Sequence, residues 1–196
     1  GMQLYYLNRT AYKKLRENNF EINDISIDYF AYSNDIYIVP EGGANEYAIT
    51  GCSEIVDEIN MQLRDLNKPN FDFIISACGT GATIAGIANR LQPHQKAIGV
   101  AVLKHENLKH EITQKYSLRN NDLSILESHF GGYAKTTPEL FQFIKKFQHQ
   151  HNIPLDFVYT GKLFYKLFNL INEGYFPSGS TIIAVHTGGV MNAKVE

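Results

Sequence analysis

The sequence has few of the residues that mark a secreted, membrane-bound or nucleic-acid-binding protein. Its 196 residues include two cysteines, Cys52 and Cys78, and no tryptophan. Two cysteines do not make a disulfide framework, so the expected compartment is a reducing cytoplasm. The longest apolar runs, such as FIISA and TIIAV, are far too short to span a bilayer. Basic runs are absent and the net charge is -2, which gives no reason to expect nucleic acid or a membrane as a partner.

What is present is the composition of an ordinary globular domain, with 44% hydrophobic and 19% charged residues. Short apolar runs alternate with segments of helical periodicity. The predicted strands are residues 3–7, 36–39, 71–77, 96–102, 123–126 and 181–186. The predicted helices are residues 10–18, 47–66, 81–91, 137–149 and 159–173. Thr10 and Thr136 or Thr137 are the start signals, the latter with Pro138 in the first turn.

This alternation predicts an α/β protein with a three-layer, open, mostly parallel sheet and helices on both faces. The predicted strands are apolar nearly throughout, as parallel strands covered on both faces are. In such sheets the ligand lies beyond the carboxyl ends of the strands. Three of these ends carry glycine pairs: VPEGGAN (39–45), ACGTGAT (77–83) and VHTGGV (185–190). We therefore expect the site to be built from these three segments.

The segment Gly79-Thr80-Gly81 fits neither of the common nucleotide-binding motifs. A dinucleotide fingerprint needs glycine where Ile84 stands, and a P-loop needs lysine where Ile87 stands. What remains is a helix start with free backbone N–H groups and nearby hydroxyls, which suits a compact phosphate. A tight strand-to-helix turn without any ligand is the alternative interpretation.

Three longer stretches resemble one family of enzymes. They are IYIVPEGGANEYAITGCSEIVDEI, GTGATIAGIA and PLDFVYTGKLFYKLFNLINEGYFPSGSTIIAVHTGGV. In this order they are similar to the pyridoxal-phosphate enzymes that include D-cysteine desulfhydrase and 1-aminocyclopropane-1-carboxylate deaminase. These enzymes have the tryptophan-synthase-β-like fold, known as fold type II. VYTGK and HTGG are the most specific of the matching pieces.

The resemblance implies a cofactor, pyridoxal 5'-phosphate, and a set of residues around it. Tyr159 would lie against the cofactor ring as the catalytic residue, and Thr187 would hydrogen-bond the pyridine nitrogen. Asn45 would face the cofactor or form a turn, and both interpretations stay open. Thr160 would join the cofactor contacts. The phosphate would sit on the backbone of Gly79, Thr80, Gly81, Ala82 and Thr83.

Two positions favour one reaction over another. The deaminases resemble YEGK and HLGG where this chain has Thr160 and Thr187, which is the pairing typical of the desulfhydrases. A hydroxyl at the pyridine nitrogen leaves that nitrogen neutral. We therefore expect β-elimination from a small amino acid, giving pyruvate, ammonia and sulfide, with cyclopropane ring opening as the alternative.

The family's Schiff-base lysine lies in a GGNK-like motif that this sequence does not contain. The only Asn-Lys pair, Asn67-Lys68, has different surroundings, and Lys162 is interpreted as a solvated or ion-paired lysine. We therefore expect a C-terminal portion that is inactive alone, with residues 1–35 as a remnant of the small domain and residues 36–196 as the cofactor-binding domain. An inactive domain that binds only an anion, or nothing, is the second hypothesis. Uncovered apolar faces predict a homodimer.

Other residues that attract attention have ordinary explanations beside the functional ones. His105 and His110 in HENLKHE are five residues apart, which fails the zinc-helix spacing and favours a solvated helix face, so no metal is expected. His186 would line the site or pack against the sheet. Cys78 would be a reactive thiol or a small core residue. Glu41 would act as a base or cap a helix.

Overall fold

The computed structural model describes residues 7–18, 38–116, 118 and 123–189. The chain divides into two compact units, residues 1–43 and 44–196. The described part of the smaller unit holds one α-helix and one short 3-10 turn, and the larger unit holds the sheet. The predicted domain boundary between residues 35 and 36 falls outside the described residues and stays a prediction.

Four parallel strands form the sheet, in the spatial order β3-β2-β1-β4. Phe73 of β1 lies opposite Lys96 of β2 on one side and Ile182 of β4 on the other. Parallel pairing brings the carboxyl ends of all the strands to one edge of the sheet, and the predicted α/β class with a parallel sheet is confirmed. The strands are Phe73–Cys78 (β1), Lys96–Ala101 (β2), Leu123–Glu127 (β3) and Ile182–Val185 (β4).

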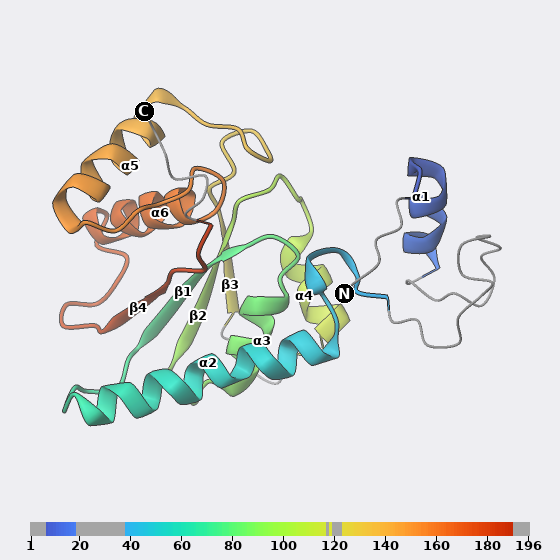
Figure 1. Cartoon of the computed structure of the whole chain (residues 1–196). Coiled ribbons are helices and arrows are strands. Elements are labelled where there is room, and N and C mark those ends of the chain that lie inside the picture. Colours follow the sequence, from blue (N-terminus) through green and yellow to red (C-terminus); the bar gives the residue numbers. More distant parts are fainter. Residues whose placement is uncertain (1–6, 19–37, 117, 119–122, 190–196) are drawn as a thin grey trace, which may run out of the picture. The chain divides into compact units, whose positions relative to one another are not determined.

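Helices cover both faces of the sheet and make the three predicted layers (Figure 1). One face carries α2, α3 and α4, and the other carries α5 and α6. Thr137 caps α5 by accepting a hydrogen bond from the Leu140 N–H at 3.3 Å, as the sequence predicts. The helices are Glu46–Asp65 (α2), Ala82–Arg90 (α3), Leu108–Tyr116 (α4), Pro138–His151 (α5) and Thr160–Asn172 (α6).

The central strand β1 explains why its sequence is apolar throughout. Successive side chains of a strand point to opposite faces of the sheet. Ile74 and Cys78 pack into the cluster under α2, α3 and α4, whereas Ile75 and Ala77 pack with Leu163 of α6. Both faces are therefore buried, which is the environment that a parallel strand needs.

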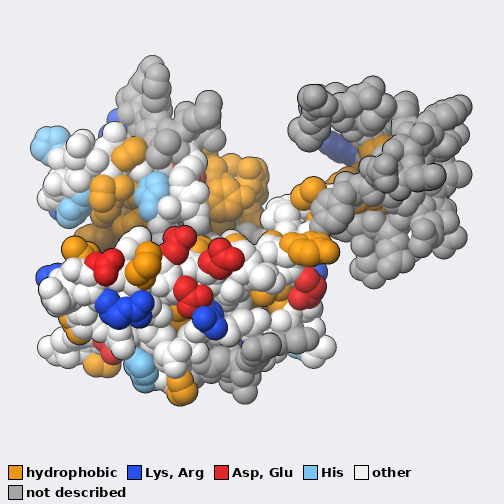
Figure 2. Space-filling model, turned by 60° about the horizontal axis from the view of Figure 1, so that its bottom comes forward, with side chains coloured by type: hydrophobic (Ala, Val, Ile, Leu, Met, Phe, Trp, Pro, Cys, Tyr) orange, Lys and Arg blue, Asp and Glu red, His pale blue; other side chains and the backbone are white. Residues whose placement is uncertain are grey.

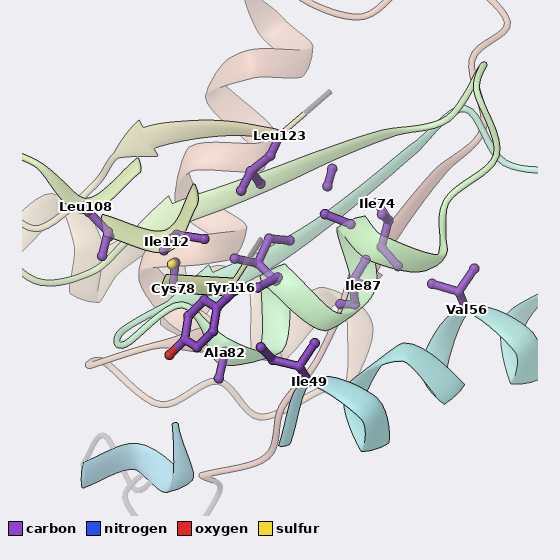
Figure 3. Packing of buried hydrophobic residues seen from close by; sticks show 14 of the residues in the cluster. Ile49, Val56, Ile74, Cys78, Ala82, Ile87, Leu108, Ile112, Tyr116 and Leu123 are labelled. Atoms are coloured by element: carbon purple, nitrogen blue, oxygen red, sulfur yellow. The ribbon is translucent and has the colours of Figure 1, made fainter. Parts of the chain in front are cut away.

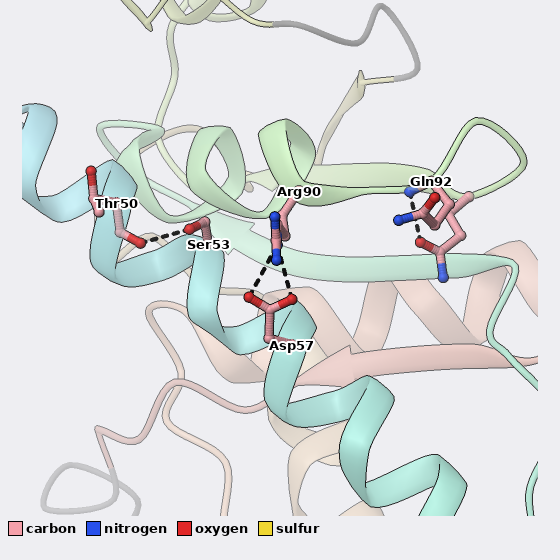
Figure 4. A network of polar contacts seen from close by, with 6 residues as sticks. Thr50, Ser53, Asp57, Arg90 and Gln92 are labelled. Carbon is pink, nitrogen blue, oxygen red and sulfur yellow. Dashed lines mark hydrogen bonds and ion pairs between the residues drawn. The ribbon is translucent and has the colours of Figure 1, made fainter.

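The close packing of α2 on α3 depends on Gly86. A Cβ at Gly86 would lie 2.5 Å from the Ile49 carbonyl oxygen and 2.7 Å from the Cys52 Cβ. Figure 3 shows Ile49 directed from α2 toward α3. At the far end of α3, the Arg90 Nε donates to both carboxylate oxygens of Asp57, at 2.9 and 3.0 Å (Figure 4). That pair is exposed and contributes little, so the glycine contact sets the spacing of the two helices.

Helix α4 includes residues 108–111 of the HENLKHE segment, for which the sequence predicted only a solvated helix face. Leu108, Ile112 and Tyr116 are its buried residues, four positions apart, and they form one apolar stripe. His110 is exposed on this helix, and His105 precedes it and is also exposed. The prediction of a solvated face is confirmed for His110.

The smaller unit departs from the sequence prediction in two places. Helix α1 (Arg9–Glu17) is capped by Asn8, whose Oδ1 accepts a hydrogen bond from the Ala11 N–H at 2.9 Å, so Thr10 is not the start signal. Within the predicted strands at residues 3–7 and 36–39, the described residues 7, 38 and 39 belong to no strand. The other residues of those two predictions lie outside the described part of the chain.

The surface of the larger unit shows no field of a single charge sign on the side that Figure 2 presents. Acidic, basic and apolar side chains are interspersed there. Among the described residues, no helix is long and apolar enough to cross a membrane.

Candidate cofactor-binding site

The glycine corner, Gly79–Thr83, joins the carboxyl end of β1 to α3. Gly81 is the N-cap of α3 with φ of +88°, and no side chain caps the helix. The first hydrogen bond of the helix runs from the Ala85 N–H to the Gly81 carbonyl at 2.9 Å. The N–H groups of residues 82–84 make no hydrogen bond to any other described residue. Free donors and the positive end of the helix dipole suit an anion at this point.

Two neighbours enclose the glycine corner. A Cβ at Gly81 would overlap the side chain of Ile112 from α4, so both its φ and its packing require glycine. A Cβ at Gly79 would lie 3.6 Å from the Tyr159 Cε1. The ring of Tyr159 is therefore the aromatic surface at the opening of the corner.

The five predicted phosphate contacts differ in exposure. Thr80 is exposed, Gly79 and Thr83 are half-buried, and Gly81 and Ala82 are buried. The exposed and half-buried members include both hydroxyls, which is compatible with a ligand at the surface of the corner. Their role in holding a phosphate stays a prediction.

Tyr159 is held in place by a buried carboxylate. Asp156 is 3% exposed, and its Oδ1 accepts hydrogen bonds from the Val158 and Tyr159 N–H groups, each at 2.7 Å. Its Oδ2 accepts from the Thr160 N–H at 2.8 Å. An acidic group at a helix N-terminus satisfies orphan donors and complements the helix dipole. Asp156 therefore fixes the turn that presents Tyr159, whose side chain is 37% exposed.

Thr160 is buried beside Asp156, and its predicted role as a cofactor contact stays a prediction. Its side chain has no exposed surface. The hydroxyl donates to the Asp156 Oδ2 at 2.6 Å and accepts from the Asp156 N–H at 2.9 Å. Thr160 therefore stabilises the turn before α6 from inside the protein.

Lys162 is neither solvated nor ion-paired, so the sequence interpretation of this residue is corrected. It is fully buried, and its Nζ donates to the carbonyl oxygens of Val102, His129 and Gly132 at 3.2, 3.1 and 3.0 Å. Burial lowers the pKa of Lys162, and the charge of Asp156 acts in the opposite direction. The side chain points at backbone carbonyls and away from solvent.

The segment after β4 approaches the same turn. A Cβ at Gly189 would lie 3.3 Å from the Asp156 Oδ2, so this segment lies beside the Asp156 turn. Thr187 is exposed within it. The structure thus brings the end of β4 and the Tyr159 turn together at the carboxyl edge of the sheet, and Tyr159 in turn contacts Gly79.

His186 has a packing role. Its Nδ1 accepts a hydrogen bond from the Gly188 N–H at 3.2 Å, which leaves Nε2 to donate to the Pro154 carbonyl at 2.9 Å. These partners fit the tautomer that carries a proton on Nε2. Of the two interpretations left open by the sequence, the packed histidine agrees with the structure.

Asn45 and Glu41 have local roles in the structure. The Asn45 Oδ1 accepts from the Ala48 N–H at 2.9 Å and caps α2, so the local interpretation holds and its cofactor contact stays a prediction. Glu41 belongs to the smaller unit, where its carboxylate accepts from the Tyr12 hydroxyl at 3.1 Å. Within the described part of the chain, no three histidine, cysteine or acidic side chains gather as metal ligands would.

Two polar groups are buried behind the corner. Burial raises the pKa of Cys78 to about 12, so this thiol stays protonated and acts as a small core residue. Tyr116 of α4 is also buried, and its hydroxyl has no hydrogen-bond partner among the described residues. Figure 3 shows its ring between Cys78 and Ala82. Burial, with smaller effects from Cys78 and Glu46, raises the pKa of Tyr116.

The sequence that forms this site matches a known family. The model of the pyridoxal-phosphate dependent enzymes matches residues 10–188. The chain belongs to this family. The resemblance carried by VYTGK and HTGG is thereby confirmed, and pyridoxal phosphate is the cofactor of the family.

Individual relatives agree with this assignment. A Pyrococcus horikoshii protein named "Putative 1-aminocyclopropane-1-carboxylate deaminase" is 34% identical over 166 residues, which cover 79% of this chain and 49% of that protein. The Arabidopsis thaliana mitochondrial bifunctional D-cysteine desulfhydrase/1-aminocyclopropane-1-carboxylate deaminase is 32% identical over 173 residues, 79% of this chain and 42% of that protein. The crystal structure of an ACC deaminase homologue has a TM-score of 0.67 and 32% identity, and covers 80% of this chain and 50% of the other. The chain thus spans about half the length of the curated relatives it matches.

Sequence reasoning missed Asp156 and the burial of Lys162. Asp156 stands four residues before Thr160, the first residue of α6, and an acidic residue shortly before a helix is a signal for its N-terminus. Lys162 gave no comparable signal, because its three acceptors are backbone carbonyls from distant segments.

Proposed function

We propose that this chain is the cofactor-binding portion of a pyridoxal-phosphate-dependent lyase or deaminase that acts on small amino acids. The observation that carries the proposal is the glycine corner, where the N–H groups of residues 82–84 bond no other described residue and the ring of Tyr159 lies at the opening. Those donors fit a phosphate and that ring fits an aromatic cofactor beside it. When bound, the cofactor would withdraw electrons from the substrate, and the protein would supply orientation and hydrogen bonds.

The residues divide into three roles. The backbone N–H groups of residues 82–84 and the hydroxyls of Thr80 and Thr83 would hold the phosphate. Thr187, exposed at the end of β4, would donate its hydroxyl proton to the pyridine nitrogen. Tyr159 would be the catalytic residue, because its partly exposed phenol is the aromatic group beside Gly79.

The reaction we propose is β-elimination from D-cysteine, giving pyruvate, ammonia and sulfide. Thr160 and Thr187 support it, since they match the desulfhydrase pattern. Cyclopropane ring opening is the second candidate, and the name of the Pyrococcus relative supports it. Release of sulfide from D-cysteine, compared with release of ammonia from 1-aminocyclopropane-1-carboxylate, separates the two reactions once a lysine-bearing portion is supplied.

This chain alone should hold the cofactor without a covalent bond. The sequence has no GGNK-like motif, and all three donors of Lys162 are taken by carbonyls. We propose that residues 36–196 form the cofactor-binding domain and that residues 1–35 are a remnant of a small domain. A domain that binds only an anion is the competing proposal.

Binding of pyridoxal phosphate tests the proposal directly. The expected result is reversible binding that inorganic phosphate weakens, with pyridoxal, which lacks the phosphate, binding less tightly. Thr80→Val and Thr83→Val should each weaken binding about tenfold, because a hydrogen bond to a charged group contributes about 1.5 kcal/mol. Thr50→Val on α2 is the matched control, since that hydroxyl bonds only the Glu46 carbonyl.

Two results would count against this assignment. Equal affinity for pyridoxal and pyridoxal phosphate would mean that the glycine corner does not bind the phosphate. If the chain binds inorganic phosphate but does not bind pyridoxal phosphate, the anion-binding alternative is favoured. Borohydride treatment followed by mass spectrometry should find no specific adduct on this chain.

The assembly we propose is a homodimer. Exposed apolar side chains, among them Tyr47, Met61 and Ile171, are 77%, 51% and 48% exposed in the single chain. Apolar surface of this kind favours association. Light scattering should therefore give twice the mass of the chain, and a monomer at all concentrations would contradict this part of the proposal.

A further inference from the structure

Lys162 has the bonding of a fixed ammonium group. A lysine ammonium carries three N–H donors and no acceptor. All three donors are matched here by the carbonyl oxygens of Val102, His129 and Gly132, within 3.2 Å. The side chain is fully buried, so water does not compete for these bonds. An ammonium group held in this way has no electron pair with which to attack a ligand, and it does not reach the surface.

The three acceptors come from two strand ends. Val102 directly follows β2, and His129 and Gly132 belong to the loop that follows β3. The Ser128 hydroxyl also donates to the carbonyl of Lys162 at 3.2 Å. One residue in the first turn of α6 therefore joins the helix to the carboxyl ends of two neighbouring strands.

The loop after β3 needs this support. Phe130 and Ala134 have φ of +53° and +52°, values that residues other than glycine rarely adopt. Gly131 and Gly132 also have positive φ. Such conformations persist where surrounding contacts over-determine them. Lys162 supplies contacts of this kind at His129 and Gly132, on both sides of the strained residue Phe130.

The charge of Lys162 is balanced from the same turn. A cation in the first turn of a helix opposes the helix dipole. Asp156 sits at that helix start and carries the opposite charge, and its oxygens hold the backbone of Tyr159 and Thr160. The turn that presents Tyr159 thus lies between an anion fixed by N–H groups and a cation fixed by C=O groups.

We propose that Lys162 is a positioning residue, which holds the loop 128–135 and the Tyr159 turn in register at the carboxyl edge of the sheet. It is not a group that reacts with the cofactor. This inference rests on the proposed function for the site that Lys162 positions. The three hydrogen bonds from the Lys162 Nζ, which we call the clamp, are a property of the chain without cofactor. The two can therefore be tested separately.

The test compares Lys162→Met, which keeps the stem and removes the donors, with Lys146→Met, which changes an exposed lysine of α5. All measurements are made at a temperature at which each variant is fully folded by circular dichroism. In Lys162→Met, amide hydrogen exchange in residues 128–135 should be about tenfold faster, and exchange in β1 unchanged. Its affinity for pyridoxal phosphate should be about tenfold weaker, whereas Lys146→Met should match the unchanged chain in both assays.

Lys162→Arg keeps the charge but replaces three radiating donors with a planar fork. Its hydrogen exchange in residues 128–135 and its affinity for pyridoxal phosphate should therefore lie between those of Lys162→Met and the unchanged chain. Nitrogen-15 NMR of the unchanged chain provides a test that needs no variant. One lysine ammonium should show protons protected from water, and the absence of such a signal would overturn the clamp. If Lys162→Met does not fold, Ser128→Ala loosens the same junction and should speed exchange in residues 128–135 to a smaller extent.

The outcomes separate the two proposals. If the unchanged chain binds no pyridoxal phosphate, the proposed function fails, and hydrogen exchange still decides the clamp. If it binds the cofactor and Lys162→Met binds it equally well with unchanged exchange, the positioning role is wrong. A borohydride-trapped cofactor on Lys162 would also overturn the proposal, because the amine would then be reactive.

Discussion

Replacing Gly86 with alanine should destabilise the larger unit, although alanine is the better helix former. The added Cβ would lie 2.5 Å from the Ile49 carbonyl oxygen and 2.7 Å from the Cys52 Cβ. Comfortable separations for such atoms are about 3.5 Å, so α3 must move away from α2 by roughly 1 Å. Both obstructing atoms belong to or lie next to the α2 backbone, and neither can rotate out of the way.

The size of the effect follows from two opposing contributions. Overpacking a well-packed contact costs about 1–3 kcal/mol, and the displaced helix also loses contacts of Ile84 and Ile87, which are fully buried. Alanine in place of a helical glycine contributes about 1 kcal/mol in the other direction. We expect the free energy of unfolding to fall by about 1–2 kcal/mol.

Gly51→Ala is the matched control, because Gly51 lies on α2 and a Cβ there would meet nothing within 4 Å. This change should raise the free energy of unfolding by about 0.5–1 kcal/mol. Urea unfolding of the two variants, with equal m-values, should separate them by about 2–3 kcal/mol. If Gly86→Ala is as stable as Gly51→Ala, the close approach of α2 to α3 is wrong.

Further predictions concern buried polar groups. Tyr116→Phe should raise the free energy of unfolding by about 1 kcal/mol, because its buried hydroxyl lacks a partner among the described residues. A lower melting temperature for this variant would contradict the absence of a hydrogen bond at that hydroxyl. Cys78, whose pKa of about 12 keeps it protonated at pH 8, should resist Ellman's reagent in the folded chain, whereas the half-buried Cys52 should react first. Rapid reaction of both thiols would contradict the burial of Cys78. Asp156→Asn should lower the free energy of unfolding by about 2–3 kcal/mol in urea, since an amide oxygen cannot accept bonds from three N–H groups and a hydroxyl. The exposed Asp57→Asn should cost under about 1 kcal/mol, and equal losses would refute the special role of Asp156.

The sheet and most of its helices could be predicted because their signals are local. A run such as FIISAC is apolar on both faces, and the structure buries both faces. Thr137 and Pro138 mark the start of α5 by their own chemistry. Helix α4 has a weaker signal, since Leu108, Ile112 and Tyr116 are its only buried residues and polar side chains fill the positions between them. At α1, the cap is Asn8 and not Thr10, and residues of either type suit that role.

The candidate site could be predicted only in part, because its parts come from distant segments. The glycine corner is visible in the sequence as a strand that turns directly into a helix. The contact between Tyr159 and Gly79 joins segments 80 residues apart and needs the fold. The same holds for Lys162, whose acceptors on Val102 and His129 lie far away in the sequence and are backbone atoms, which no residue pattern can indicate.

The TGK of VYTGK is a family pattern whose three residues each make structural contacts here. Thr160 bonds Asp156 in the interior, and Lys162 bonds three carbonyls. Gly161 has no room for a side chain, because a Cβ would lie 2.6 Å from the Asp156 carbonyl oxygen. Each residue is required by the turn that carries Tyr159. A glutamate at position 160, as in the deaminase-like pattern, would set a second carboxylate against Asp156 and force that turn to rearrange.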